Sequence, residues 1–208
     1  MSETLQMMFE IIGTVAFSVS GAMVGVSKKM DIFGVAILGI TAAVGGGVIR
    51  DIILGLNPPV IFTDPTYALI ASATSIIVFL PSVRNLLKEN PVYYERALFL
   101  MDSIGLGIFT VVGIQTAYSS AGEHSIFLLT FVGVVTGVGG GILRDMLAGD
   151  RPYIFVKHFY ACASIIGALV CSIMWLEFGQ AISMMSGTAI IIALRICAAK
   201  FRWSLPRA

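Results

Sequence analysis

Seven apolar stretches follow one another along the chain, and most reach or approach the roughly 20 residues that an α-helix needs to cross a bilayer. They cover residues 7–26, 33–54, 66–81, 97–117, 125–147, 158–176 and 181–199. These stretches occupy most of the 208 residues, and only 12% of the residues are charged, against about 25% in soluble domains. The sequence therefore predicts an all-α membrane protein with seven transmembrane helices, folded as a single polytopic domain over residues 1–208.

The distribution of basic residues predicts how these helices are oriented. If the N-terminus lies outside, ten of the 13 Lys and Arg residues fall in cytoplasmic loops or the tail, and the outer loops contain none. The ten are Lys28, Lys29, Arg84, Lys88, Arg96, Arg151, Lys157, Lys200, Arg202 and Arg207. Because cytoplasmic loops are enriched in Lys and Arg, we expect an external N-terminus and a cytoplasmic C-terminus. The first apolar run has no basic residue before it, so we expect this helix to be retained rather than cleaved as a signal peptide.

Two short segments have nearly the same sequence: residues 45–51 read GGGVIRD and residues 139–145 read GGGILRD. A similar offset aligns the first predicted helix with the fourth. The matched pairs there are Glu10 and Asp102, Gly13 and Gly105, Phe17 and Phe109, and Gly21 and Gly113. The chain is therefore predicted to contain two repeats, at about 7–81 and 97–176, followed by one extra helix at about 181–199.

Each predicted repeat contains three spans, an odd number. The second copy must therefore enter the membrane from the side opposite to the first, which makes the plan a 3+3 inverted repeat plus one C-terminal helix. Inverted repeats are common in transport proteins, where the shared site lies between the two copies near the bilayer midplane. We expect the functional site of this protein in that position.

The two glycine triplets lie inside predicted spans. They are Gly45, Gly46 and Gly47 in the first repeat and Gly139, Gly140 and Gly141 in the second. Glycine is about 1 kcal/mol less favourable than Ala inside a helix, and backbone groups loosened in lipid must find partners in protein or water. One interpretation is that each triplet bends its helix and turns carbonyl groups toward a hydrated pathway. The alternative is close helix packing, because small residues let two backbones approach.

An Arg-Asp pair follows each triplet, Arg50 with Asp51 and Arg144 with Asp145. Residues adjacent in sequence do not face each other on a helix, so we expect each arginine to find its partner elsewhere. Charges inside a membrane are expensive and usually functional. These four residues are therefore candidate structural or gating groups.

The inverted arrangement supplies a candidate acid for each arginine. Glu10 is expected near Arg50 at the outer mouth, and Asp102 near Arg144 at the inner mouth, which predicts two symmetry-related acid–arginine contacts. The alternative is that both arginines extend to the headgroups, because both are close to helix ends. For Arg195, about one turn before Lys200, extension to the headgroups is the favoured interpretation.

Several classes of function lack support in the sequence. The chain contains no Walker motif and no GxSxG motif, and its two histidines, His124 and His158, show no metal-ligand spacing. We therefore expect no enzyme activity, no resident metal or cofactor and no nucleic-acid partner.

Paired GGG-x-x-R-D segments in a three-plus-three-plus-one plan resemble the prokaryotic members of the trimeric intracellular cation channel family. The same class of sequences is often labelled in bacteria as a glycine transporter domain that is present twice. The resemblance implies a homotrimer in the membrane lipid, with one pore through each protomer. It also implies permeation by K⁺ with some Na⁺, and kinked second and fifth helices whose glycine triplets line the pore. Animal members carry a Lys-Glu-Val element associated with voltage response, and this chain has none.

Two functions follow from these features. The first is a passive channel for monovalent cations in the bacterial inner membrane, in which carbonyl groups at the triplets replace part of the ion's hydration shell. The second is a carrier that moves glycine or another small solute by alternating access, since inverted repeats with broken helices suit a carrier equally well. A purely structural role leaves the intramembrane arginines unexplained.

Overall fold

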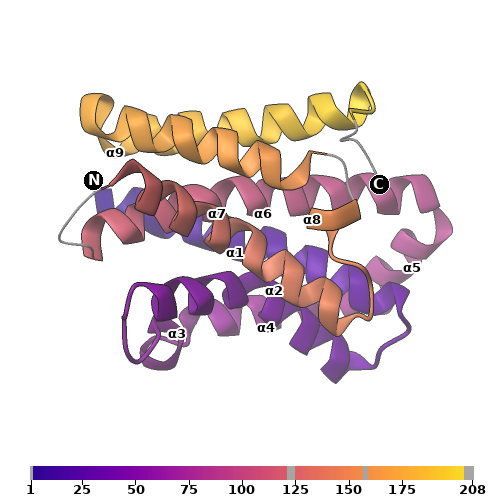
Figure 1. Ribbon diagram of the computed structural model, residues 1–208. Helices are drawn as coiled ribbons and strands as arrows, with labels where there is room; N and C mark the ends of the chain where they lie inside the picture. Colours follow the sequence, from indigo (N-terminus) through magenta and orange to yellow (C-terminus); the bar gives the residue numbers. More distant parts are fainter. Residues whose placement is uncertain (1, 121–124, 157–158, 204–208) are drawn as a thin grey trace.

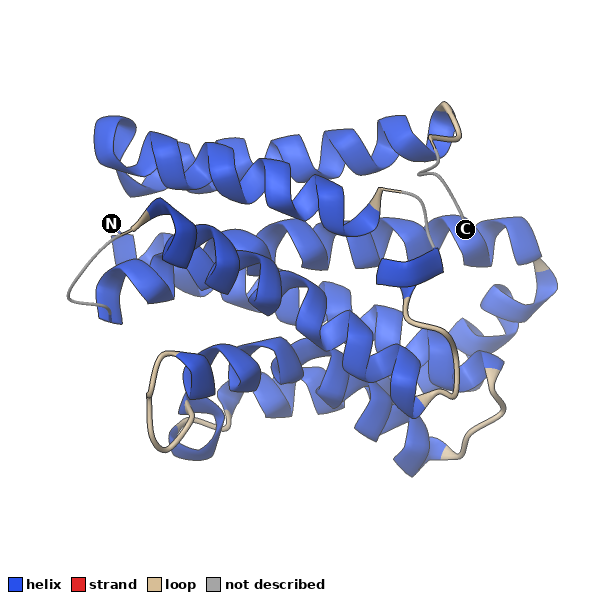
Figure 2. Ribbon diagram, in the orientation of Figure 1, coloured by secondary structure: helices blue, strands red, loops and turns tan. Residues whose placement is uncertain are grey.

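The computed structural model describes residues 2–120, 125–156 and 159–203, and the regular structure in these ranges is helical throughout (Figure 2). The helices are α1 (Ser2–Ser27), α2 (Ile32–Ile53), α3 (Val60–Thr63), α4 (Thr66–Phe79), α5 (Pro81–Glu89), α6 (Pro91–Ser120), α7 (Ile126–Leu147), α8 (Tyr153–Val156) and α9 (Tyr160–Lys200). His124, Lys157, His158 and Arg207, which entered the sequence analysis, lie outside the described residues.

Five of these helices are long and apolar enough to cross a membrane: α1, α2, α6, α7 and the second half of α9. The helix at the third predicted span, α4, is shorter than these five, because it ends at Phe79 and the chain then bends by 69° into α5. Taken together, α4 and α5 qualify as a sixth crossing. The sixth predicted span corresponds to the apolar helix Tyr160–Trp175, which is shorter than the five. The protein is thus an all-helical membrane protein in which two of the seven expected spans are short.

A break at Gly179 divides α9 into two halves. Gly179 has φ 74° and ψ 175°, a conformation that only glycine adopts easily. The two halves fold back on each other as a helical hairpin (Figure 1), and Gly167 and Gly187 lie in their contact, where added Cβ atoms would meet the facing half at 2.2 and 2.8 Å. The predicted boundary between residues 176 and 181 is therefore confirmed as a turn.

The two repeats begin and end their second helices in the same way. Asp31 caps α2 by accepting a hydrogen bond from the N–H of Gly34, and Ser125 caps α7 by accepting one from Leu128. Gly55 and Gly149 follow the C-termini of α2 and α7 with φ of 71° and 73°, as expected for a glycine that terminates a helix. The capping residues obey the same offset as the glycine triplets, so the duplication extends to the local signals that define each helix.

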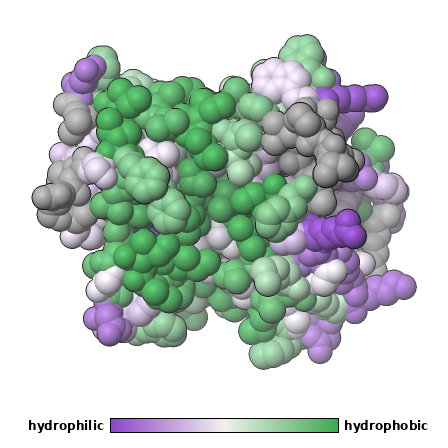
Figure 3. All heavy atoms as spheres, in the orientation of Figure 1, coloured by the Kyte–Doolittle hydropathy of each residue, from purple (hydrophilic) through white to green (hydrophobic). Residues whose placement is uncertain are grey.

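Four helices form the centre of the bundle. α1 packs against α2 and α6, and α7 packs against α2 and α6. The outer layers are equivalent, because α4 covers α1 and α2 while α9 covers α6 and α7 (Figure 1). α1 begins at the left of Figure 1, and α9 ends at the right. Apolar residues cover the middle of the face shown in Figure 3, and hydrophilic residues gather at its left and right ends, as expected for a bundle that crosses a membrane along this direction.

Candidate functional site

The glycine triplets form the crossing between α2 and α7. A Cβ atom on Gly46 would lie 2.1 Å from the carbonyl oxygen of Thr136, and one on Gly140 would lie 2.0 Å from that of Ala42. Thr136 is the repeat equivalent of Ala42, so the contact is reciprocal, as two-fold related surfaces require. These two glycines are therefore needed for the close approach of the two backbones.

Neither glycine triplet breaks its helix, because α2 and α7 are α-helical throughout. Close packing, the alternative interpretation, accounts for Gly45, Gly46, Gly139 and Gly140, whose added Cβ atoms would meet the facing helix at 3.2 Å or less. The last glycine of each triplet differs. Gly47 lines a cavity, and Gly141 faces the hydroxyl group of Tyr160.

A second reciprocal crossing joins α1 and α6. The rings of Phe17 and Phe109 are stacked, with centroids 5.5 Å apart and planes inclined by 28°. Each ring also packs on a glycine of the facing helix: Phe17 on Gly105, and Phe109 on Gly13. Two of the four residue pairs that the sequence matched between the repeats thus build this crossing at the centre of the bundle.

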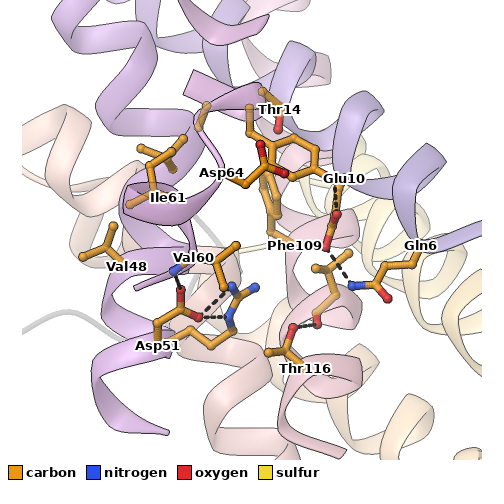
Figure 4. Close-up of a pocket in the computed structure, with 16 residues that line it drawn as sticks. Gln6, Glu10, Thr14, Val48, Asp51, Val60, Ile61, Asp64, Phe109 and Thr116 are labelled. Carbon is orange, nitrogen blue, oxygen red and sulfur yellow. Dashed lines mark hydrogen bonds and ion pairs between the residues drawn. The ribbon is translucent and has the colours of Figure 1, made fainter. Parts of the chain in front are cut away.

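A cavity of about 280 Å³ enters the bundle beside this crossing. Its walls come from the N-terminal half of α1, the C-terminal halves of α2 and α6, and the segment from α3 to α4 (Figure 4). The charged side chains that line it are Glu10, Arg50, Asp51 and Asp64. Three acids and one base give the lining a net negative charge. We refer to this space as the outer cavity, because the positive-inside pattern of the sequence predicts that it faces the outside.

The arginine in the outer cavity pairs with its sequence neighbour. Arg50 Nη2 lies 2.7 Å from Asp51 Oδ1, and Asp51 Oδ2 accepts a hydrogen bond from the N–H of Val60. The expectation that adjacent residues do not pair is therefore wrong: the long guanidinium side chain folds back along the last turn of α2 to reach the carboxylate. The predicted contact between Glu10 and Arg50 is also wrong, because Glu10 accepts hydrogen bonds from Gln6 and the Tyr67 hydroxyl.

Asp64 contributes a permanent negative charge at the rim of the outer cavity. Its carboxylate accepts a hydrogen bond from the N–H of Thr66 at the start of α4, 3.0 Å away. Hydrogen bonding from Thr66 lowers the pKa of Asp64 below its usual value, so the carboxylate stays ionised at neutral and mildly acidic pH.

The equivalent position in the second repeat is closed and fully buried. Arg144 Nη1 lies 2.7 Å from Asp102 Oδ1, and Arg144 Nη2 lies 2.8 Å from Asp145 Oδ1. Arg144 also donates a hydrogen bond to Ser20 of α1. The predicted contact between Asp102 and Arg144 is confirmed, and Asp145 joins it as Asp51 joins Arg50.

Arg195 of α9 is part of the same buried cluster. It is only 3% exposed, and its Nη2 lies 3.3 Å from Asp102 Oδ2. Its guanidinium group also stacks on the rings of Phe99 and Tyr160, 4.9 and 4.7 Å from their centroids. The expectation that Arg195 extends to the headgroups is therefore wrong, because the side chain turns inward to the one carboxylate that it shares with Arg144. We refer to Asp102, Arg144, Asp145 and Arg195 as the inner cluster.

A second cavity, of about 570 Å³, enters from the opposite end of the bundle. It is lined by the C-terminal end of α1, the N-terminal end of α6 and the C-terminal end of α9. Arg195 forms part of its wall, so this cavity borders the inner cluster. We refer to this space as the inner cavity.

The polar residues Ser20, Tyr67, Tyr160 and Arg195 belong to these two sites, and sequence reasoning assigned none of them there. Tyr67 and Tyr160 are 93 residues apart, close to the offset of the other repeat pairs, and this spacing is the sequence signal that points to them. Their surroundings differ, however: Tyr67 donates a hydrogen bond to Glu10, whereas the buried Tyr160 hydroxyl has no hydrogen-bond partner among the described residues.

Comparison with known proteins agrees with this geometry. A family model described as glycine transporter matches the chain twice, at residues 7–82 and 99–176. The chain belongs to this family. The two matched segments correspond to the two repeats recognised from the glycine triplets, and each contains one Arg-Asp pair.

Relatives with similar sequences and structures cover almost the whole chain. The UPF0126 inner membrane protein YadS of Escherichia coli K12 is 35% identical over 94% of this chain and 91% of its own length. A solved structure of a TRIC cation channel is 35% identical, covers 97% of this chain and 96% of its own, and has a TM-score of 0.80. The TRIC trimeric intracellular cation channel orthologue from Rhodobacter sphaeroides is 30% identical over 96% and 99% of the two chains, with a TM-score of 0.86. The resemblance to the prokaryotic trimeric intracellular cation channels is therefore confirmed.

Proposed function

We propose that this protein is a passive channel for monovalent cations, K⁺ with some Na⁺, and that each protomer contains its own pathway. One observation carries the proposal: two cavities enter the bundle from opposite ends along the same pair of helices. On α1 the outer cavity reaches from Gln6 to Thr14, and the inner cavity lies at Val24 and Ser27. Thr14 and Val24 are ten residues apart on α1, which corresponds to ~15 Å of closed protein at 1.5 Å per residue.

The charge of the outer cavity suits a cation. A cleft lined by one sign of charge raises the local concentration of the opposite ion. The net negative lining of the outer cavity, with Asp64 at its rim, therefore favours K⁺ and Na⁺ over chloride. Arg50 and Asp51 neutralise each other as an ion pair. The net negative charge of the lining therefore comes from Glu10 and Asp64.

In this proposal the inner cluster is the closure of the pathway. Asp102 holds an arginine from α7 and an arginine from α9, and Arg144 is also bonded to Ser20 of α1. Helices α1, α6, α7 and α9 are thus tied together beside the inner cavity. Opening requires these ion pairs to separate, which makes Arg144, Asp102 and Arg195 the gating residues of the proposal. In the first repeat, the Arg50–Asp51 ion pair is the smaller equivalent of the inner cluster, and it lines the outer cavity.

The membrane arrangement is part of the proposal. Reciprocal contacts at α2–α7 and α1–α6 support two-fold related repeats of inverted topology, and α1 begins at the end of the bundle opposite to the end of α9. We place the N-terminus outside, the C-terminus in the cytoplasm and the protein in a bacterial inner membrane, as its Escherichia coli relative is described. We also propose a homotrimer, because the Rhodobacter sphaeroides relative is described as trimeric.

A carrier for glycine or a similar zwitterion is the second candidate. The observation in its favour is that the outer cavity is closed at its inner end and contains both a guanidinium group, on Arg50, and carboxylates, on Glu10 and Asp64. A site of this kind offers partners to both ends of an amino acid. Alternating access would then bring the inner cavity to the same solute.

Reconstitution of the purified protein in a planar bilayer separates the two functions. The channel predicts discrete unitary currents in KCl whose reversal potential follows the K⁺ gradient, and which disappear when K⁺ is replaced by a large organic cation. Saturable uptake of labelled glycine into proteoliposomes, without unitary currents, would instead identify a carrier.

A further inference from the structure

Polar residues line both ends of the proposed pathway, but its middle is aromatic. On α1, Thr14 lines the outer cavity. Ser20, further along the same helix, accepts a hydrogen bond from Arg144 of the inner cluster. Between them lies Phe17, stacked on Phe109. The two stacked rings therefore lie, along α1 and α6, between the residues of the outer cavity and those of the inner cluster.

The two rings differ in the space around them. Phe17 is completely buried and pressed onto Gly105, where even a Cβ atom would lie 2.2 Å from its ring. Phe109 is 9% exposed and forms part of the wall of the outer cavity. Phe109 therefore borders the space of the outer cavity, whereas Phe17 lines neither cavity.

We propose that Phe17 and Phe109 form a hydrophobic gate, separate from the ion pairs of the inner cluster, in which Phe109 is the moving ring and Phe17 the fixed one. This inference rests on the proposed channel function. Apolar constrictions block ions by excluding water, so that an ion would have to lose its hydration shell without receiving polar partners. When the Phe109 ring swings into the outer cavity, water from that cavity reaches Ser20 and the inner cluster.

Cysteine labelling tests the gate without depending on ion conduction. Native Cys162, Cys171 and Cys197 are replaced by alanine, and a single cysteine is introduced at Thr14 or at Ser20. A small, membrane-impermeant, cationic thiol reagent is then applied from the side on which Thr14→Cys reacts. We expect Ser20→Cys to be protected when Phe109 is present and to react at least several-fold faster with Phe109→Ala.

Phe131→Ala is the matched control, because Phe131 is stacked on Phe127 in the same way but is 48% exposed on the outer surface of α7. It should leave the labelling of Ser20→Cys unchanged. Phe109→Leu keeps an apolar side chain of similar bulk and should give an intermediate rate, which separates removal of the ring from loss of fold.

Single-channel recording gives the second measurement. Phe109→Ala should raise the open probability in KCl at least several-fold, and Phe131→Ala should not. If the wild type conducts but Phe109→Ala changes neither labelling nor open probability, the aromatic gate is refuted while the channel stands. If the wild type passes no current, the channel proposal fails, and the labelling result still decides whether the rings exclude water.

Discussion

Arg144 and Asp102 form an ion pair of 2.7 Å between Nη1 and Oδ1 in which neither side chain has any exposed surface. Asp102 also faces Arg195, so one carboxylate serves two buried arginines from two helices. Buried charges are costly unless they are paired, and removal of one partner leaves the other uncompensated. The shared carboxylate is therefore the most sensitive single position of the inner cluster.

Replacing Asp102 with asparagine should destabilise the closed protein. The change leaves Asp145 as the remaining carboxylate partner of Arg144, and it removes the carboxylate that faces Arg195. Loss of one partner from a buried ion pair costs about 3–5 kcal/mol. Thermal unfolding in detergent should show a large decrease in the midpoint, and variants that remain folded should have a higher open probability. Asp150→Asn is the control, because its ion pair with Lys28 is exposed and such pairs contribute about 0–1 kcal/mol. Equal effects of the two substitutions would contradict a role of the inner cluster in closure.

Alanine at Gly46 or Gly140 should separate α2 from α7. The added methyl group would lie about 2 Å from a carbonyl oxygen of the facing helix, and overpacking of this kind typically costs about 1–3 kcal/mol. Gly47→Ala is a matched control in the same triplet, because its Cβ would meet nothing closer than 3.7 Å. Alanine is about 1 kcal/mol more favourable than glycine in a helix, so this variant should be as stable as the wild type or more stable. Thermal unfolding of the three variants measures the difference, and a stable Gly46→Ala would argue against the tight crossing.

Neutralising Asp64 should reduce cation conductance at low salt. In the Asp64→Asn variant the amide oxygen can still accept the hydrogen bond from the N–H of Thr66, because Asn and Asp both accept from the backbone two residues on. The substitution therefore removes charge while it preserves local structure. Exposed charges are screened at high ionic strength, where the Debye length falls to about 3 Å at 1 M salt, and the difference from wild type should then disappear. Glu177→Gln is the control, because Glu177 is exposed but does not line the outer cavity. A conductance loss that persists in concentrated KCl would show that Asp64 acts by some means other than its charge.

The sequence predicts the duplication well, because the residues that repeat are those that make close contacts between helices. Gly13 and Gly105, which are 92 residues apart, each pack against a phenylalanine ring, and Gly46 and Gly140, which are 94 residues apart, form the α2–α7 crossing. The offset therefore points to residues that meet between the repeats. It could not show whether the triplets bend or pack, since small residues serve both purposes.

The difference between the two mouths was not predictable from the repeat. Inversion predicts the same contact for Glu10 with Arg50 as for Asp102 with Arg144, but only the second contact forms. The second half of α9 has no counterpart in the first repeat, and it brings Arg195 to Asp102 alone. A symmetric sequence pattern contains no information about this additional side chain, whose position depends on the hairpin at Gly179.

The paired tyrosines of the two repeats should respond in opposite directions when their hydroxyl groups are removed. The Tyr160 hydroxyl is buried and has no hydrogen-bond partner among the described residues, a state that costs about 1–3 kcal/mol. Tyr160→Phe should therefore leave stability unchanged or raise it, and should favour the closed state. Tyr67 donates its hydrogen bond to Glu10, and hydrogen bonds to charged groups contribute about 1.5–3 kcal/mol, so Tyr67→Phe should lower stability. Thermal midpoints in detergent measured side by side give the sign of each change. A loss of stability in Tyr160→Phe comparable to that in Tyr67→Phe would mean that the Tyr160 hydroxyl is satisfied in the membrane, for example by water that reaches the inner cluster.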